Sequence, residues 1–449
     1  MSFLISLVSF IVALGILVAV HEWGHFWVAR RCGVKVQRFS IGFGKALWRR
    51  TDKLGTEYVI AAIPLGGYVK MLDERVDEVS EEDLPYAFNR QHVLKRIAII
   101  AAGPGVNFLF AIFALFVMYL IGLQTIKPVV GSIQPDSVFS QVNIPANAIL
   151  TQVGDRKVVD WEDVAYEFMS FIGHDEMQVK WTDEKTTFER SATINLSEWK
   201  FDPDKTSVFS SLGLIPFRPK VLNVLGSVQD GSAAQSIGFQ ANDKIVSLDG
   251  TSMQNWEQIV RYVSTRPNQA VEASVLRDEQ IISLNGSIGS KTVKQTTKGY
   301  MGFTPTLEPW PEGVAFVHQY GVVKALSKAM DKTWRLMTLS IDMLGKLITG
   351  DVSVKSLSGP ISIAQGAGMS ASLGLVYFLG FLALISVNLG IINLLPLPVL
   401  DGGHLLYYFI ELFSGRPVPE SVQEVGFKIG GVLLLLLMSI AIVNDIARL

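Results

Sequence analysis

The chain has 449 residues, of which 49% are hydrophobic and only 18% charged, and its mean hydropathy is +0.34. Soluble domains usually carry about a quarter charged residues, so this composition predicts membrane-spanning segments. The net charge is −2 and no long basic block occurs, which argues against a nucleic-acid partner. The single cysteine, Cys32, excludes an intrachain disulfide and thiolate zinc sites. Any metal site must therefore use histidines and carboxylates.

Four apolar segments are long enough, or nearly so, to cross a bilayer as helices. The first could instead be a cleaved signal peptide, but it lacks a basic stretch before Phe3 and a small-residue cleavage site. We therefore expect four transmembrane helices, over residues 3–20 continuing through HEWGHFWVA, 97–123, 373–398 and about 429–443.

Basic residues predict the orientation of these spans, because positive charge collects on the cytoplasmic side. The loop between the first two spans ends at Lys95 and Arg96 and also holds Arg30, Arg31, Lys35, Arg38, Lys45, Arg49, Arg50 and Lys53. The loop is therefore expected in the cytoplasm. Residues 124–370 and both termini are then outside, which is the periplasm in a Gram-negative bacterium.

The same cytoplasmic loop has strand character with glycine turns, in VQRFSIGFG, KALWRR and YVIAAIPLGGYVKM. One interpretation is a membrane-associated β-hairpin, buried against protein, whose open edge pairs with an extended substrate. The other is an ordinary surface sheet.

An internal repeat fills the segment after the second span. Gly131 aligns with Gly226, Asn147 with Asn242 and Trp161 with Trp256, at a constant spacing of 95 residues (226 − 131). Alternating apolar runs predict strands, and WEDVAYEFM and WEQIVRYV predict short helices. Each repeat resembles a PDZ domain. SLGLIPF, with Gly213, and YMGFTPT, with Phe303, are then candidate loops for a peptide carboxylate, unless the repeats are spacers with closed grooves.

The segment 309–370 differs again, because VVKALSKAMDKTWRLMTLSIDMLGKLI spaces apolar residues at helical period between charged ones. We expect one or two amphipathic helices lying on the membrane surface or against the spans.

The chemistry concentrates in His21, Glu22 and His25 at the end of the first span. The two histidines are four residues apart, so both imidazoles lie on one helix face and reach one metal ion. Glu22 lies beside that ion as a general base, which is the H-E-x-x-H arrangement of zinc peptidases. Two satisfied core histidines are the weaker interpretation, because a carboxylate and two imidazoles in a span are costly without a function.

Zinc needs a third protein ligand and one open position. Asp401 and His404 compete for that role after the third span, where Pro396 and Pro398 break the helix. By the residues alone, a helix N-cap is an equally good role for Asp401.

Taken together, H-E-x-x-H in the first span, the N-x-x-P-x-P-x-L-D-G run that begins at Asn393, and GPGVN in the second span resemble the site-2 protease family of intramembrane metalloproteases. The resemblance covers essentially the whole chain. It implies an α-helical polytopic membrane protein with four transmembrane helices, a membrane-associated β-hairpin region and two tandem periplasmic PDZ (α+β) domains. The implied division is 1–124, 125–219, 220–308, 309–370 and 371–449.

The implied activity is that of a zinc metalloendopeptidase that cuts within transmembrane segments. His21, His25 and Asp401 would bind Zn²⁺ and Glu22 would act as the base. Residues expected to contact substrate are Asn393, Pro396, Pro398, Gly213 and Phe303. The expected substrates are single-pass proteins in the bilayer, namely a trimmed anti-sigma factor and remnant signal peptides. The enzyme would lie in the bacterial inner membrane with its site near the cytoplasmic face, and the PDZ pair would filter substrates by size or end. A membrane-anchored PDZ adaptor and a zinc transporter or scaffold remain the alternatives; neither needs a general base.

Overall fold

The computed structural model describes residues 3–183, 186–202, 205–293 and 296–448. The chain forms two compact units. One consists of Met1–Ile215 together with Phe316–Leu449, and the other of Pro216–Ala315. The first unit thus contains the apolar helices and the first repeat, and the second unit is formed by the second repeat.

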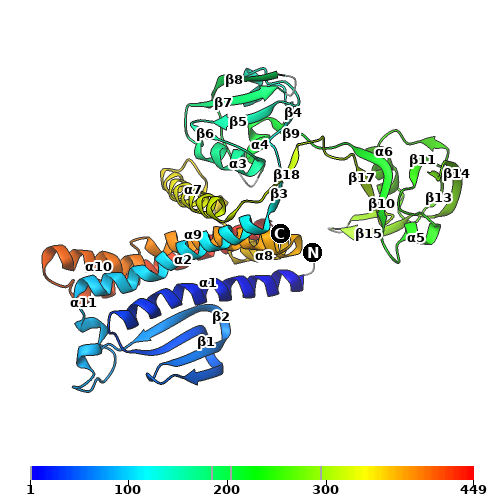
Figure 1. The fold of residues 1–449 in the computed structure, drawn as a ribbon. Helices are drawn as coiled ribbons and strands as arrows, with labels where there is room; N and C mark the ends of the chain where they lie inside the picture. The colour runs from blue at the N-terminus through cyan, green and yellow to red at the C-terminus, as the bar shows by residue number, and fades with distance from the viewer. Residues whose placement is uncertain (1–2, 184–185, 203–204, 294–295, 449) are drawn as a thin grey trace. The chain divides into compact units, whose positions relative to one another are not determined.

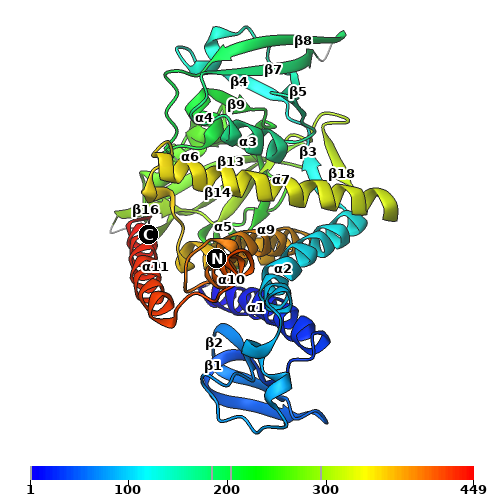
Figure 2. The same ribbon diagram turned by 90° about the vertical axis from the view of Figure 1, so that its left-hand side faces the viewer.

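Within the described residues, four helices are long and apolar enough to cross a membrane: α1 (Phe3–Arg31), α2 (Val93–Ile121), α9 (Leu375–Leu394) and α11 (Glu420–Arg448). Helices α1, α2 and α9 lie side by side (Figures 1 and 2). Helix α11 is 29 residues long, longer than its apolar run predicts, because polar helix-forming residues extend it at both ends.

The loop after α1 forms a small sheet from β1 (Val36–Thr51) and β2 (Glu57–Met71). Each strand folds back, so that Ile41 lies opposite both Gly67 and Ile60, whereas Thr51 lies opposite Glu57. The bend in β1 is at Gly42 and Gly44, whose φ angles of 92° and 86° suit glycine. Residues 46–51 pair on one side only among the described strands. The sheet is followed by two 3₁₀ turns, η1 (Leu84–Tyr86) and η2 (Phe88–Arg90).

The first repeat combines a four-stranded sheet, of order β6-β5-β7-β8, with the pair β4-β9 and two helices. A further strand, β3, pairs with β18 (Ala315–His318). The elements are β3 (Leu123–Ile126), β4 (Val130–Ile133), η3 (Val138–Gln141), β5 (Ile149–Val153), β6 (Arg156–Lys157), α3 (Trp161–Ser170), β7 (Glu176–Asp183), β8 (Thr186–Asn195), α4 (Val208–Leu212) and β9 (Leu214–Pro216).

The second repeat has the sheet order β14-β13-β11-β10-β17, with β12 on β11, and a separate hairpin β15-β16. Its elements are β10 (Val221–Val228), α5 (Ala233–Ile237), β11 (Lys244–Leu248), β12 (Thr251–Ser252), α6 (Trp256–Ser264), β13 (Ala270–Arg277), β14 (Gln280–Ser287), β15 (Gly289–Val293), β16 (Thr296–Tyr300) and β17 (Phe303–Leu307).

The two repeats share fine detail in the part of each that surrounds α3 and α6. Asn147 and Asn242 both have a positive φ, of 67° and 70°. Asp160 caps the N-terminus of α3 and Asn255 caps that of α6 through the same side-chain bond. Each repeat has its own buried core, but the core of the first also contacts Met343 and Val352, from beyond the repeat.

Helix α7 (Val322–Thr349), which carries Met343, lies between the first repeat and the apolar helices (Figure 2). Ala325, Ala329 and Leu336 pack on α2 and α9, whereas Lys332 and Arg335 face α3. The amphipathic helix expected in 309–370 is thus packed against the spans and against the first repeat.

Three more elements complete the first unit: η4 (Val354–Ser356), α8 (Pro360–Leu373) and α10 (Asp401–Ser414). The carboxylate of Asp445, in α11, accepts hydrogen bonds from the backbone N–H groups of Gly359, Ile361 and Ser362 at the start of α8. This contact anchors the C-terminal end of α11.

Candidate metal centre

The two histidines of α1 converge as their spacing predicts. His21 and His25 are buried, and their Nε2 atoms lie 3.2 Å apart. Their rings meet edge to face with centroids 4.8 Å apart. A helix that places i and i+4 on one face produces this arrangement without any special backbone.

Helix α2 approaches these imidazoles closely because small residues face them. A Cβ atom on Gly103 would lie 2.2 Å from His25 Nε2 and 2.8 Å from His21 Cε1. In α1, between the two histidines, a Cβ on Gly24 would lie 2.5 Å from the carbonyl oxygen of Ala102. Close contact of two membrane helices needs small residues at such positions. The rings therefore occupy the space that Gly103 leaves.

The second nitrogen of each ring also faces α2. His25 Nδ1 donates a hydrogen bond of 2.9 Å to the carbonyl oxygen of Ile99. A carbonyl only accepts, so this bond places the His25 proton on Nδ1 and leaves a lone pair on Nε2. His21 Nδ1 lies 3.1 Å from the side-chain amide of Asn107. Gly103 and Asn107 belong to the GPGVN segment, for which the sequence by itself indicated no role.

Asp401 reaches the histidines from the other side of the site. Helix α9 ends at Leu394, and α10 begins at Asp401 with Leu400 in the N-cap position and no side-chain cap. The N-cap alternative for Asp401 is therefore not what the structure shows. Oδ2 of Asp401 lies 3.2 Å from His21 Nε2 and 3.4 Å from His25 Nε2.

The turn that carries Asp401 is tight, and its glycines allow it. A Cβ on Gly402 would lie 2.2 Å from the carbonyl oxygen of Leu395, and one on Gly403 would lie 2.4 Å from that of Leu397. Pro396 and Pro398 lie within the same turn, between the two helices. This backbone geometry is the physical reason for the L-D-G-G run.

The three ligand atoms suit a divalent cation such as zinc. Ligands about 2.0–2.1 Å from a tetrahedral zinc ion are about 3.3 Å from each other, and the three separations here are 3.2, 3.2 and 3.4 Å. Asp401 Oδ2 is buried without a hydrogen-bond donor. Electron pairs that converge in a buried site need a cation or protons between them. The donor set therefore fits the metal.

Glu22 lies beside this cluster, where β2 meets α1. A Cβ on Gly67 would lie 2.8 Å from Val18 Cγ1 and 3.0 Å from Glu22 Cγ. Gly67 thus lets the sheet pack directly on the α1 turn that carries the glutamate. The electrostatic neighbours of Glu22 are His25, His21 and Asp401. The Glu22 carboxylate is therefore close enough to the ligand cluster to interact with the charge of a bound cation.

Other residues singled out in the sequence lie elsewhere. His404 is outside the ligand cluster and packs on Phe427, with ring centroids 5.3 Å apart. Asn393 is half-buried near the end of α9. Gly213 ends α4 with a φ of 80°, and a Cβ there would lie 2.1 Å from the Ser137 side chain. Phe303 packs in the second repeat, on Phe239 and Trp256. The structure does not bring Gly213 into the cluster.

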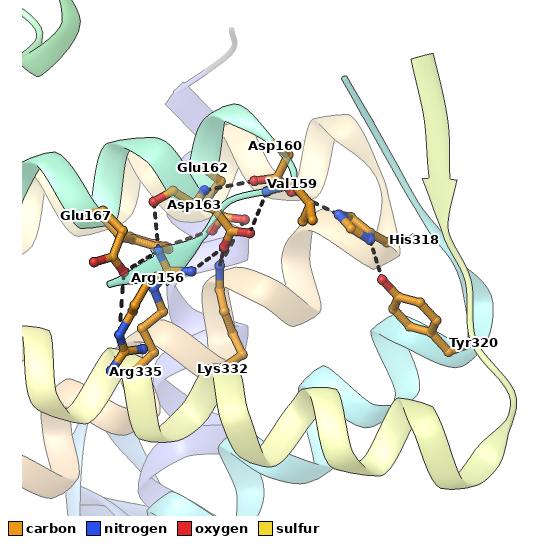
Figure 3. A network of polar contacts seen from close by, with 11 residues as sticks. Arg156, Val159, Asp160, Glu162, Asp163, Glu167, His318, Tyr320, Lys332 and Arg335 are labelled. Carbon is orange, nitrogen blue, oxygen red and sulfur yellow. Dashed lines mark hydrogen bonds and ion pairs between the residues drawn. The ribbon is translucent and has the colours of Figure 1, made fainter. Parts of the chain in front are cut away.

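A second polar cluster joins α3 to α7 (Figure 3). Arg335 pairs with Asp163 and, at 2.7 Å, with Glu167, and Lys332 lies 3.3 Å from Glu162. His318 lies between Asp160, at 3.0 Å, and the hydroxyl of Tyr320, at 2.7 Å.

Two acids in this cluster titrate differently. Burial alone would raise the pKa of Asp160, but hydrogen bonds from His318 and from the Asp163 backbone N–H outweigh it and lower that pKa. Burial raises the pKa of Glu167 above its ordinary value despite Arg335.

A model of peptidase family M50 matches residues 9–437. The chain is 52% identical to Protease RseP of Yersinia pestis and 51% identical to Regulator of sigma-E protease RseP of Escherichia coli strain K12, each over the full length of both chains. It is 47% identical to a Putative zinc metalloprotease of Vibrio cholerae, over 99% of each chain.

Proposed function

The chain belongs to peptidase family M50 and is a zinc metalloprotease, and from this premise we propose that His21, His25 and Asp401 hold the zinc ion while Glu22 is the general base. One observation carries the assignment: three ligand atoms from α1 and α10 converge at tetrahedral spacing on one buried point. Because α1 is also a candidate span, peptide hydrolysis would take place within the membrane.

The roles of the residues follow from the chemistry of peptide hydrolysis. Bound zinc supplies a Lewis acid that acidifies water and polarises a peptide carbonyl. Glu22 accepts a proton from the attacking water, whose oxygen forms a bond to the peptide carbon. As the carbon–nitrogen bond breaks, Glu22 returns that proton to the leaving amine. In this assignment His21 and His25 would hold zinc through their Nε2 atoms, and their Nδ1 atoms face α2.

We propose that the substrate is a single transmembrane segment that unwinds before it is cut, because helical carbonyls are already hydrogen-bonded. Residues 46–51 of β1 pair with a described strand on one side only, and the other edge of this segment is available to pair with the unwound substrate. Asn393 and the turn with Pro396 and Pro398 lie next to Asp401 in the chain and form the other contact. One relative is named Regulator of sigma-E protease RseP, and we propose an anti-sigma factor as one substrate and remnant signal peptides as a second class.

We propose that the two repeats, 125–219 and 220–308, are periplasmic PDZ domains that filter substrates by size in an inner-membrane enzyme. The membrane parts are then 1–124 and 371–449, joined to the repeats by 309–370. Support comes from the equivalent capped helices α3 and α6 and from the equivalent glycines, Gly213 and Gly302, with φ angles of 80° and 82°. The basic loop after α1 supports a site near the cytoplasmic face.

Glu22→Gln tests the catalytic proposal. The variant should keep zinc and lose cleavage of a single-pass model substrate, because only the base is removed. Binding of zinc without cleavage by the unmodified protein would instead support an adaptor or a zinc carrier.

Thiol labelling tests the orientation. Asp230→Cys and Thr265→Cys should react with a membrane-impermeant reagent in spheroplasts, and Cys32 should not. The opposite pattern would reverse the orientation.

Loss of the second repeat tests the filter. Replacing Pro216–Ala315 by a short flexible linker removes one compact unit and should let untrimmed substrate be cut. A well-folded variant that cuts neither full-length nor trimmed substrate would contradict the filter. Gly213→Glu is unsuited to this test, because the Ser137 contact and the positive φ at Gly213 would strain the loop.

A further inference from the structure

Asn107 is a buried polar residue with an incomplete set of partners. It is 0% exposed in α2, and its Oδ1 atom has no hydrogen-bond partner. Its own backbone carbonyl accepts a bond of 2.8 Å from Ser386 Oγ in α9. The backbone of Asn107 is therefore held by α9, and its side chain is free to serve another purpose.

The side-chain amide lies against His21, with its nitrogen 3.1 Å from Nδ1. If that nitrogen donated, Nδ1 would be the acceptor and the ring proton would lie on Nε2, in the place where a cation must bind. An amide oxygen and nitrogen have nearly the same shape, so the group can be turned by half a rotation without moving the chain. Oδ1 then accepts from Nδ1–H, and the lone pair of Nε2 faces His25 and Asp401.

Ile99, Gly103 and Asn107 repeat at four-residue intervals along one face of α2. Ile99 offers its carbonyl oxygen to His25, Gly103 leaves room for both rings, and Asn107 offers its amide to His21. With the Asn107 amide turned so that Oδ1 faces His21, helix α2 presents an acceptor, a gap and an acceptor to the two imidazoles. Metal-binding histidines almost always donate their second N–H to such an acceptor.

We propose that Asn107 is the positioning residue that holds His21 in its zinc-binding tautomer, by accepting the Nδ1 proton at Oδ1. The inference rests on the proposed zinc site. It assigns Asn107 no contact with the substrate, only with His21. A carboxylate could take the same place, since carboxylate–histidine–zinc arrangements are common.

The test compares Asn107→Leu, which removes the acceptor at similar volume, with Asn107→Asp, which keeps it. Zinc affinity of the full chain in detergent is measured by competition with a chelator. Loss of such a partner typically costs about 10- to 100-fold in metal affinity, so that loss is expected for Asn107→Leu, whereas Asn107→Asp should stay near the unmodified protein. Ser386→Ala is the matched control, because it removes the bond to the Asn107 backbone and leaves His21 untouched.

Each result bears on the inference. Unchanged affinity in Asn107→Leu, or equal loss in Asn107→Leu and Asn107→Asp, overturns it, the second by showing that the acceptor is not what matters. His21→Ala separates the two levels: retained zinc there would refute the proposed site itself, whereas lost zinc there with normal Asn107→Leu refutes only the positioning role. Nitrogen-15 NMR of zinc-loaded, histidine-labelled protein needs no variant. It should show a protonated Nδ1 on His21, and zinc on Nδ1 would overturn the inference.

Discussion

His318 and Asp160 lie 3.0 Å apart, and His21 and Asp401 lie 3.2 Å apart, so the two pairs are similar in geometry. Their surroundings differ. The ring of His318 has a partner at each nitrogen, Asp160 and Tyr320. In the other pair, His21 and His25 both direct Nε2 at an Asp401 oxygen that has no donor.

The comparison indicates that uncompensated charge distinguishes a metal-binding cluster from a cluster that only holds two elements together. In the α3–α7 cluster, basic Arg335 and Lys332 face acidic Asp163 and Glu162, so charges of opposite sign are paired within the protein. In the candidate metal centre, three acceptors face each other and a cation completes the set. A buried charge is tolerated only when it is paired or bound to a metal.

The largest effect that would break this comparison is expected at the two aspartates. Asp401→Ala should lose zinc and reduce cleavage to background, because a ligand is removed. Asp160→Ala should keep zinc and the cleavage of trimmed substrate. Metal analysis and cleavage of a model substrate measure both, and full zinc occupancy in Asp401→Ala would contradict the distinction.

A smaller effect is expected at Arg335, where the comparison predicts a structural loss only. Removing one partner of a buried ion pair costs about 3–5 kcal/mol, so Arg335→Ala should expose the first repeat to proteolysis while zinc stays bound. Lys328→Ala, an exposed basic residue on the same helix, is the control. Equal protease resistance of the two variants would show that the α3–α7 pairs do not hold the repeat.

Lowering the pH should separate the two regions. The pKa of Asp160 is lower in the folded protein than its unfolded value of about 3.9, so ionised Asp160 stabilises the fold when the pH is above that unfolded value. This contribution is lost only as the pH falls through the folded-state pKa. Zinc binding needs deprotonated ligands and weakens earlier. Titration from pH 7 to 4 should release zinc before the first repeat becomes sensitive to protease. The reverse order would count against the assignment of Asp160.

Glu167 sharpens the comparison at a finer level. Its pKa is raised, so ionising it costs stability as the pH rises through the folded value, and Arg335 offsets part of that cost. Glu167→Gln should therefore change the melting temperature at neutral pH much less than Asp163→Asn. A larger loss for Glu167→Gln would reverse the ranking of the two acids.

The smallest effect is expected at His404, which packs on Phe427 outside the ligand cluster. His404→Ala should keep zinc and retain cleavage within about threefold, which is about 0.7 kcal/mol in transition-state stabilisation. Loss of zinc would make His404 a ligand and require a different arrangement of α10.

Local patterns predicted much of the fold. Apolar length predicted the four candidate spans, because crossing a bilayer is a matter of hydrophobic run and rise per residue. The 95-residue repeat predicted a pair of equivalent short helices, which the structure shows as α3 and α6. His21 and His25 were predictable as neighbours because helix periodicity alone places them on one face.

Three features were beyond the sequence, because each depends on contacts between distant segments. Asp401 could be read equally as a cap or a ligand until the turn before α10 placed its carboxylate beside the histidines. The partnership of Asn107 with His21 depends on how α1 and α2 pack at Gly103. The tie between the first repeat and α7 depends on acids in α3 that α6 lacks, since Asp163 and Glu167 align with Gln258 and Tyr262. Periodicity acts within one element and is visible in the sequence, whereas complementary charge and close packing exist only once two elements meet.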